Sequence, residues 1–343
     1  MNKNLSPIIP NITLSTTFAQ QKPEQGGYSR VDNPTRLLLE QKLAKLEKGK
    51  FSLTFSSGSA AATTMLLSLK VNDHIICSQD VYDGTLRLLE KVFKKLNIDF
   101  SLVNFTDIEN VKKAIKPNTK LIWFENLTNP LLKQINTAEI SKLVKNTNIK
   151  ILVDNTFATP IFKNPLTKGA DIVLHSLTKF IGGHHDVTAG ALILNDQKLF
   201  NKLKFLQHTI GAIPSPFDCF QIIQHLKTLP IRMKHHQENA RKIAKFLQKH
   251  PQINKVNFPG FSGIISFWIK TNPDNFLKKL KLIKIAHSLG GTETTILHPT
   301  SMMTLSVSEK QKQKMKITKN LFRLSVGLEN HHLIINDLNQ TLK

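Results

Sequence analysis

Cysteine is scarce in this sequence of 343 residues, and its scarcity excludes two classes of protein. The two cysteines, Cys77 and Cys219, cannot form a disulfide framework and do not have the spacing of a zinc site. We therefore expect a protein of a reducing compartment, with the cytoplasm as the default location. The first residues also lack a positive patch followed by a continuous apolar run, so a secretory signal peptide is not expected.

Long apolar runs are missing as well. The hydrophobic share is 40% and the aromatic share only 7%, and the apolar runs are no longer than ordinary strands and helices. A membrane-spanning helix is therefore not expected, because it needs about 20 consecutive apolar residues. The length permits a sizeable core in two or three domains, which is typical of a globular protein and not of a small stapled module.

Acidic residues are few, and the resulting formal net charge of +23 raises the question of a nucleic-acid partner. The lysines, however, are spread over almost every predicted helix. Arginine, the usual reader of phosphates and bases, occurs only at positions 30, 36, 87, 232, 241 and 323. We therefore expect no nucleic-acid partner and interpret the charge as a compositional bias. A basic binding protein without catalytic activity is kept as the alternative from another class.

Short apolar runs alternate with helical patterns between about residues 50 and 195: FSLTF, HIICS, FSLVNF, KLIWFE, KILVDN, DIVLHS and GALILN. Such alternation predicts an α/β fold, with a mostly parallel central sheet and helices on both faces. A capped helix is expected over DNPTRLLLEQKLAKLEKG, with Asp32 or Asn33 at its N-cap. We predict an N-terminal arm over residues 1–30, a large domain over 31–222, and a smaller α+β domain over 223–343 that one long helix opens.

The residues that follow each run are the candidates for function, because parallel α/β sheets bind ligands at the carboxyl ends of their strands. The turn after FSLTF contains Gly58 and Ser59 and opens a helix, which predicts an anion site. Each later candidate is also explained as an ordinary turn residue. Together, however, they place an aromatic ring, a carboxylate and a lone lysine at the same sheet edge: Tyr82, Asn129, Asp154, Ser176, Thr178 and Lys179. This combination suits pyridoxal phosphate, which has a phosphate, an aromatic ring, a pyridine nitrogen and an aldehyde.

Several stretches carry a resemblance to a known family over nearly the whole chain: YSRVDNPTR, FSSGSAA, DVYDGT, NLTNPLLK, VDNTFATPIFKNPLTKGADIVLHSLTKFIGGHHD, PSPFDC, TLPIRM, SLGGTET and RLSVGLEN. In this order they resemble the Cys/Met metabolism family of pyridoxal-phosphate enzymes, the group of cystathionine γ-synthase, γ-lyase and β-lyase. The resemblance implies fold type I of the PLP-dependent transferases, which is aspartate aminotransferase-like. It also implies pyridoxal 5′-phosphate as the cofactor.

The resemblance assigns a role to each candidate at the sheet edge. Lys179 is implied to hold the cofactor aldehyde and to move protons during the reaction, and Tyr82 to stack on the ring and act as an acid or base. Asp154 is implied to face the pyridine nitrogen. Asn129 is implied to lie near the ring hydroxyl or the substrate carboxylate. Two hydroxyls and two backbone amides are implied to bind the phosphate, those of Ser176, Thr178, Gly58 and Ser59.

The resemblance also implies a subunit contact. Tyr28 and Arg30 match residues that reach the cofactor phosphate of the neighbouring subunit, so a homodimer with shared sites is expected, usually paired into a tetramer. Arg323 matches the residue whose planar fork holds the substrate carboxylate, a geometry that lysine lacks. Arg87 is a further candidate at the substrate entrance.

The implied reaction makes or breaks the carbon–sulfur bonds of cystathionine-type amino acids. Similarity to γ-synthases in stretches such as DNTFATP favours γ-replacement or γ-elimination, and β-elimination to homocysteine, pyruvate and ammonia is the alternative. Gly84 stands where methionine γ-lyases have cysteine, which makes that activity more remote. His287 and Ser288 are implied to lie beside the substrate, and the position of His287 varies with reaction type. No metal site is expected, because the paired histidines that begin at positions 184, 235 and 331 have no ligand spacing.

Overall fold

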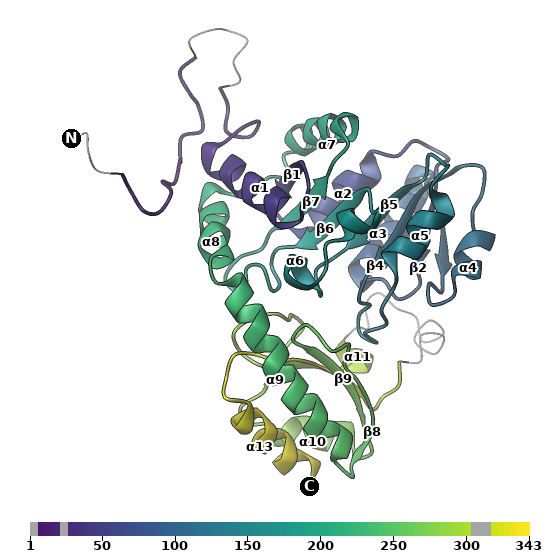
Figure 1. Cartoon of the computed structure of the whole chain (residues 1–343), viewed down its shortest axis with the longest axis vertical. Helices are drawn as coiled ribbons and strands as arrows, with labels where there is room; N and C mark the ends of the chain where they lie inside the picture. The colour runs from purple at the N-terminus through teal and green to yellow at the C-terminus, as the bar shows by residue number, and fades with distance from the viewer. Residues whose placement is uncertain (1–5, 21–26, 303–316) are drawn as a thin grey trace.

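The computed structural model describes residues 6–20, 27–302 and 317–343. Its larger sheet has the strand order β1-β7-β6-β5-β4-β2-β3 (Figure 1). The strands β2 to β6 pair in parallel, whereas β7 runs antiparallel to both of its neighbours. The mostly parallel sheet that the sequence predicts is confirmed. Its strands are β1 Phe51–Phe55, β2 His74–Ser78, β3 Asp99–Val103, β4 Thr119–Glu125, β5 Lys150–Asp154, β6 Ile172–Ser176 and β7 Gly190–Leu194.

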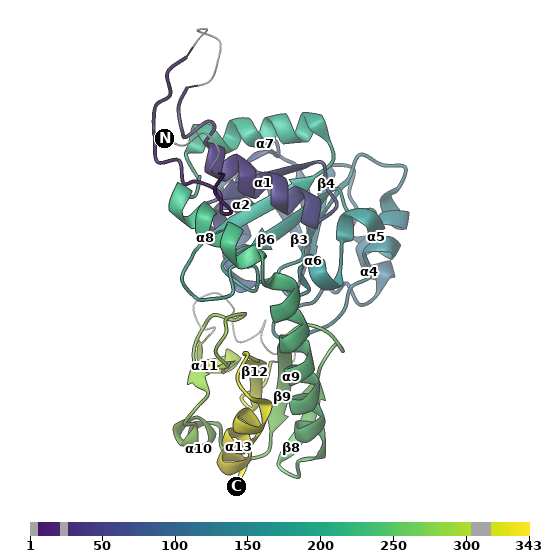
Figure 2. The same ribbon diagram turned by 60° about the vertical axis from the view of Figure 1, so that its left-hand side comes forward.

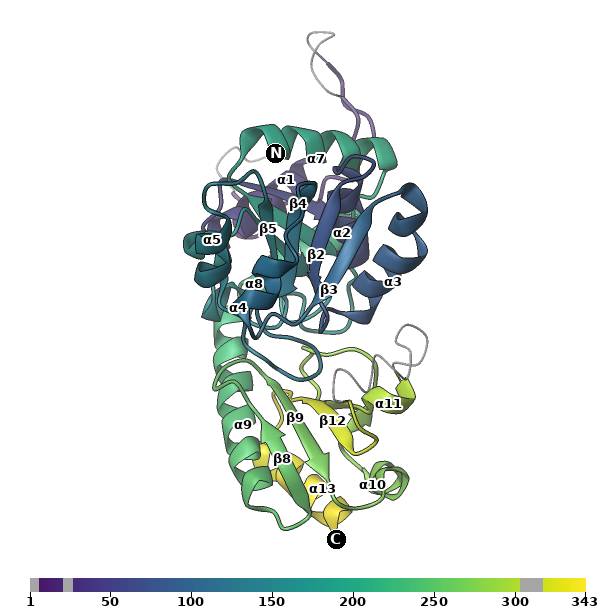
Figure 3. The ribbon, with the colours of Figure 1, turned by 90° about the vertical axis from the view of Figure 1, so that its right-hand side faces the viewer.

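Helices cover both faces of this sheet, as Figure 3 shows. On one face Leu152 and Leu174 pack against α2, α3 and α7. On the other face Val153 packs against α4 and α5, and Val173 packs against α1 and α8. Successive strand residues therefore point to opposite helical layers, which is why the strands are apolar almost throughout. The helices are α1 Pro34–Leu46, α2 Gly58–Leu67, α3 Asp83–Lys91, α4 Ile108–Lys113, α5 Thr137–Val144, α6 Thr159–Phe162, α7 Gln197–Ile210 and α8 Pro216–Leu226, with 3₁₀ helices at Phe93–Leu96 and Pro165–Lys168.

The smaller sheet has the order β10-β11-β12-β9-β8 and is mainly antiparallel. Phe267 and Phe322 on one face pack against α9, α10 and α13. The smaller sheet contacts a loop of the larger part, because Asn257 Nδ2 at the end of β8 donates to the carbonyl of Leu131 over 2.9 Å. The elements are β8 Ile253–Asn257, β9 Ile264–Ile269, β10 Lys284–Ile285, β11 Thr295–Leu297, β12 Leu321–Ser325, α9 Leu229–Lys249, α10 Pro273–Lys279, α11 Pro299–Met302 and α13 His331–Leu342.

One helix, α9, connects the two parts of the molecule (Figure 2). Met233 near its start packs in the core of the larger part, whereas Ile243 packs against the smaller sheet. The long helix expected after about residue 222, over HLKTLPIRMKHHQENARKIAKFLQKHP, is confirmed as α9, but it starts later than expected, because α8 ends at Leu226 and α9 starts at Leu229. Pro230 lies in the first turn of α9, where proline favours a new helix start. The predicted domain boundary after residue 222 falls inside α8, and the division into domains stays a prediction.

The N-terminal arm is described over residues 6–20 and 27–30 and projects from the larger part in Figures 1 and 2. The rest of the predicted arm, residues 1–5 and 21–26, and residues 303–316 of the predicted C-terminal domain lie outside the described residues. Asn33 is the N-cap of α1, since its side chain accepts from the amides of Thr35 and Arg36.

Within the described ranges, no helix has the length and apolar character needed to cross a membrane.

Candidate active site

A cavity of about 320 Å³ lies at the carboxyl ends of the parallel strands, where the sequence places the functional residues. Among the residues that line it are most of the predicted ones: Gly58, Ser59, Tyr82, Asn129, Asp154, Ser176, Thr178, Lys179, His287, Ser288 and Arg323. They come from both parts of the molecule, since Ser288 and Arg323 belong to the smaller one. The fold therefore brings most of the predicted set into one cavity.

Lys179 follows β6 in a turn that backbone hydrogen bonds close. The amide of Gly182 donates to the carbonyl of Leu177, and the amide of Gly183 donates to the carbonyl of Lys179, both over 2.7 Å. Gly183 has φ +73°, and a Cβ there would lie 2.0 Å from Nη1 of Arg232, so glycine is required. Gly183 thus lets the buried Arg232 approach the turn that carries the lysine.

The amine of Lys179 is suited to nucleophilic chemistry. Its Nζ donates to Oγ of Ser288 over 3.0 Å. Burial, and secondly the positive charge of Arg323, lowers the pKa of Lys179 to about 8. A substantial share of the amine is therefore neutral near physiological pH, which attack on an aldehyde requires.

The N-terminus of α2 lies at the cavity where the sequence predicts an anion site. Ser57 is the N-cap and accepts from the amide of Ala60 over 3.0 Å, which leaves the first-turn amides of Gly58 and Ser59 without helical acceptors. A Cβ on Gly58 would lie 3.0 Å from Cβ of Ser176, so the glycine permits the close approach of β6. The Thr178 hydroxyl donates to the carbonyl of Ala189 over 3.2 Å and accepts from its amide over 3.1 Å.

Two carboxyl groups lie side by side on neighbouring strands. Asp154 on β5 is in register with Glu125 on β4, and Asp154 Oδ1 accepts from the amide of Thr156 over 2.9 Å. Burial raises the pKa of Asp154. Burial, together with the negative charge of Asp154, holds the pKa of Glu125 well above its ordinary value. An aromatic cation placed between the strand ends would relieve both effects.

Glu125 is a site residue that the sequence reasoning missed. Its Oε1 accepts from the amide of Tyr82 over 2.5 Å, and its Oε2 accepts from the amide of Asn129 over 3.0 Å. One buried carboxyl group therefore holds the backbone of two predicted site residues. Its position as the last residue of KLIWFE was a signal, because a charge that ends a buried strand faces the functional edge of the sheet.

We predict that Glu125→Gln lowers the free energy of unfolding by about 1–3 kcal/mol. The amide nitrogen cannot accept a hydrogen bond, so the N–H of Tyr82 or of Asn129 loses its acceptor. Denaturant unfolding measures the change. The exposed Glu238 on α9 supplies the control, since Glu238→Gln breaks no such contact. Equal stability of both variants would show that the two backbone contacts do not stabilise the site.

Tyr82 is exposed at the cavity and caps α3 without a side-chain hydrogen bond. Partial burial, and then the charge of Asp83, raises the pKa of its hydroxyl. A Cβ on Gly84 would lie 2.3 Å from Cε1 of Tyr82. The small residue at position 84 thus leaves the space that the tyrosine ring occupies.

Arg323 links the larger and smaller parts at the cavity. Its Nη1 donates to Oδ1 of Asn129 over 2.9 Å, and Nη2 donates to the carbonyls of His287 and Ser288 over 3.3 and 3.2 Å. Its buried Nε has no hydrogen-bond partner within the described structure. Burial lowers the pKa of Arg323 to about 10, so the group stays charged at neutral pH. An unpaired, buried cationic donor on the wall of a cavity suits an anionic ligand group. His287 itself is exposed on the same wall.

Three predicted residues do not line the cavity. Arg87 lies on α3 with Nη2 3.8 Å from Oδ2 of Asp83, and the wall is formed by Thr85 and Leu88 of that helix instead. Tyr28 and Arg30 are exposed on the arm, with the Arg30 guanidinium 5.4 Å from the centre of the Tyr28 ring. The structure therefore leaves the arm pair outside the cavity of its own chain.

The donor set of the cavity fits pyridoxal phosphate. An amine with a lowered pKa suits an aldehyde, first-turn amides suit a phosphate, and the adjacent carboxyl groups suit a protonated pyridine nitrogen. The described residues contain no cluster of three or more histidine, cysteine or acidic side chains that could hold a metal ion. The chemistry of the wall is thus that of an organic cofactor with an anionic arm.

Known proteins resemble the chain over its full length. A family model described as Cys/Met metabolism PLP-dependent enzyme matches residues 2–343. A cystathionine γ-lyase of Dictyostelium discoideum is 41% identical over 99% of this chain and 94% of its own length. A cystathionine β-lyase of Coxiella burnetii is also 41% identical, over 94% of this chain and 89% of its own.

The fold is shared with solved structures. The crystal structure of metB from Corynebacterium glutamicum superposes with a TM-score of 0.95 at 40% identity, and the match covers 99% of this chain and 94% of that one. The predicted fold type I of the PLP-dependent transferases is confirmed. Sequence identity does not separate γ- from β-chemistry, because relatives with both names are equally similar.

Proposed function

This chain belongs to the family of Cys/Met metabolism PLP-dependent enzymes, and we propose that it makes or breaks the carbon–sulfur bonds of cystathionine-type amino acids. It is an enzyme and uses pyridoxal phosphate, as the sequence predicts. The alternative of a binding protein without catalysis is therefore excluded. Relatives named cystathionine γ-lyase and β-lyase support the proposed substrate class.

One observation carries the proposal, namely the amine of Lys179 with a lowered pKa in a cavity that also presents an anion site and a buried arginine. We assign the phosphate to the first turn of α2 and to the hydroxyls of Ser176 and Thr178. Because the Thr178 hydroxyl donates to Ala189, it must turn its proton to reach a phosphate. Asp154 faces the pyridine nitrogen in this assignment, and Asn129 faces the ring hydroxyl or the substrate carboxylate.

Bound pyridoxal phosphate supplies an electron-withdrawing ring that stabilises negative charge at the α-carbon of an amino acid. The chain supplies the positions and the protons. The Arg323 fork would hold the substrate carboxylate, and Nζ of Lys179 would take up the α-proton. The Tyr82 hydroxyl, whose pKa is raised, holds its proton at neutral pH and is placed to donate it to a leaving group.

Within this class we propose γ-replacement or γ-elimination, as the sequence favours, with β-elimination as the alternative. The equal identity of a named β-lyase keeps the alternative open. Gly84, whose absent side chain accommodates the Tyr82 ring, leaves methionine γ-lyase activity the remoter choice.

Product analysis separates these reactions. The enzyme loaded with cofactor is incubated with cystathionine, and the keto acid is identified. A second reaction contains cysteine and an activated homoserine ester. 2-Oxobutyrate from cystathionine, or cystathionine from the ester, establishes γ-chemistry. Pyruvate with homocysteine establishes a β-lyase and overturns the γ assignment.

We further propose a homodimer in which the arm of one subunit completes the cofactor site of the other, and a pair of such dimers as a tetramer. The exposure of Tyr28 and Arg30 away from their own cavity supports the shared site. We propose the cytoplasm as the location, on the scarcity of cysteine. Light scattering of the loaded enzyme measures the size of the assembly.

The pH dependence of cofactor capture follows from the lowered pKa of Lys179. Only the neutral amine attacks the aldehyde, so the rate rises with pH and levels off above the pKa of about 8. Stopped-flow absorbance over a series of pH values measures the profile. Arg323→Met removes a nearby positive charge, so its midpoint lies higher. A wild-type midpoint near the ordinary lysine value of about 10.4 would contradict the assignment.

A further inference from the structure

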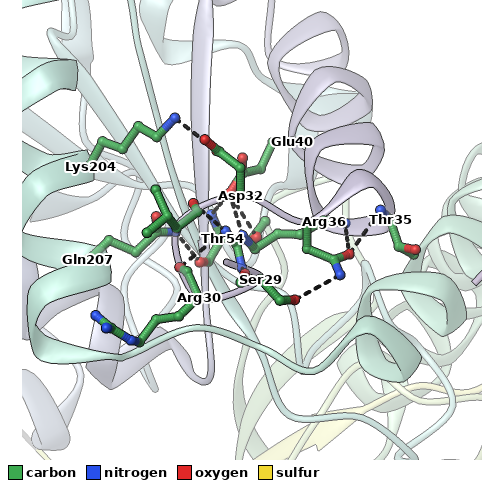
Figure 4. Close-up of polar contacts among 11 residues, drawn as sticks. Ser29, Arg30, Asp32, Thr35, Arg36, Glu40, Thr54, Lys204 and Gln207 are labelled. Carbon is green, nitrogen blue, oxygen red and sulfur yellow. Dashed lines mark hydrogen bonds and ion pairs between the residues drawn. The ribbon is translucent and has the colours of Figure 1, made fainter. Parts of the chain in front are cut away.

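The short turn that carries Tyr28 and Arg30 is held from inside by a buried arginine (Figure 4). Arg36, in the first turn of α1, is 2% exposed. Its Nη1 donates to the carbonyl of Ser29 over 2.9 Å, and its Nη2 donates to the carbonyls of Arg30 and Val31 over 3.3 and 2.6 Å. One guanidinium therefore holds the last two carbonyls of the arm and the carbonyl of Val31, which follows it.

Arg36 is in turn anchored to the large sheet. Its Nε lies 3.9 Å from Oε1 of Glu40, one helical turn along α1. That carboxylate accepts from the amide and the hydroxyl of Thr54 on β1, over 2.8 and 3.0 Å. Gln207 of α7 donates to the carbonyl of the same threonine over 2.6 Å. The chain of contacts in Figure 4 thus runs from the core of the fold to the arm.

The side chains of Tyr28 and Arg30, which the proposed shared site needs, make contacts separate from those of Arg36. Arg30 donates from Nη1 to the carbonyl of His208 at the end of α7, and its guanidinium lies over the Tyr28 ring. Lys204 of α7 pairs with Asp32 over 2.9 Å. The turn is therefore held on two sides, and its exposed pair of side chains has a defined place on the surface.

We propose that Arg36 is a positioning residue for the cofactor phosphate site of the neighbouring subunit. It acts through the backbone of residues 29–31, which presents Tyr28 and Arg30 to a second copy of this chain. The inference rests on the proposed shared site and adds a residue that never touches the phosphate itself. A planar fork is needed because one group must satisfy three carbonyls, and the single ammonium of lysine cannot span them.

Arg36→Lys is the test substitution, since it keeps the charge beside Glu40 and loses the fork. The arm is then correctly placed for only a fraction of the time, and the apparent dissociation constant rises by the inverse of that fraction. We expect about a tenfold rise for pyridoxal phosphate. The dissociation constant of pyridoxal, which has no phosphate, stays unchanged. Equilibrium dialysis of the full-length protein measures both.

Hybrid dimers separate positioning from a structural defect. Two differently tagged subunits are co-expressed and purified through both tags. In the altered-arm hybrid, one subunit carries Arg36→Lys with Lys179→Ala and the other is wild type. In the intact-arm hybrid, the two substitutions are on different subunits. Each hybrid has one Lys179, and the two differ only in whether Arg36→Lys is in the subunit whose arm reaches that lysine or in the subunit that contains it.

The readout is the concentration of pyridoxal phosphate that half-saturates borohydride-stable labelling of Lys179. We expect the altered-arm hybrid to need about tenfold more cofactor than the intact-arm hybrid. Equal values for the two hybrids, or a higher value for the intact-arm hybrid, would overturn the inference, because a local folding defect would weaken labelling in the subunit that itself carries Arg36→Lys. An Arg30→Ala pair of hybrids tests the premise. If the two Arg30→Ala hybrids also give equal values, the shared site itself is contradicted. If they differ while the two Arg36→Lys hybrids give equal values, only the role of Arg36 is overturned.

Discussion

Lys179→Ala is expected to lower kcat by about 10³-fold or more, because the proposed function assigns to this one amine both the binding of the cofactor aldehyde and the transfer of the α-proton. The geometry behind this expectation is the buried amine, hydrogen-bonded to Ser288 and with a pKa lowered to about 8. Steady-state kinetics of cystathionine turnover at saturating cofactor gives the change. The absorption band of the lysine-bound cofactor, and its reduction by borohydride, should be lost in the same variant.

A second lysine provides the control for this substitution. Burial also lowers the pKa of Lys163, but its Nζ lies over the ring of Phe261 and not on the cavity wall. Lys163→Ala should therefore retain kcat within a few-fold of wild type, since no bond to the substrate changes. If Lys179→Ala kept wild-type kcat while its thermal unfolding was unchanged, another residue would have to carry the chemistry.

Arg323→Lys is expected to lower kcat/KM by about 10- to 100-fold, chiefly through KM. The planar fork offers two parallel donors to a carboxylate, and the loss of one charge-assisted hydrogen bond is worth about 1.5–3 kcal/mol. Nε of Arg323 has no hydrogen-bond partner in the described structure. Its Nη1 donates to Asn129, and its Nη2 donates to the backbone carbonyls of residues 287 and 288. The kinetics with cystathionine give kcat and KM separately.

Two arginines outside the cavity serve as controls for this result. Arg241 is exposed on α9, and Arg241→Lys should leave KM unchanged. Arg87→Lys should have a smaller effect than Arg323→Lys, because Arg87 contacts Asp83 and does not line the cavity. A wild-type KM in Arg323→Lys together with a raised KM in Arg87→Lys would indicate that Arg87, and not Arg323, binds the substrate carboxylate.

The sheet edge could be predicted because each step of the argument is local. The apolar runs predict strands, parallel strands end on one side, and the polar residues after them must then lie together. The strands end as expected, with Asp154 as the last residue of β5 and Ser176 as the last residue of β6. Resemblance then supplied what local patterns lack, the pairing of this edge with Arg323 from far along the chain.

Other features depend on contacts between distant segments and could not be predicted. Glu125 looked like the end of an apolar run, and its role depends on the backbone of Tyr82 and Asn129 reaching it. Arg36 looked like an ordinary helix residue, yet it folds back on the arm. The start of α9 at Leu229 could be predicted only by interpreting Pro230 as a residue in the first turn of a new helix, because the helical pattern of the sequence continues across the break.

The most direct measurement of the central claim is the location of the bound cofactor. The loaded enzyme is reduced with borohydride and digested, and the peptide that carries the pyridoxyl group is sequenced by mass spectrometry. The account predicts one labelled peptide, with the group on Nζ of Lys179. Labelling of a different lysine, or none after full loading with cofactor, would contradict it.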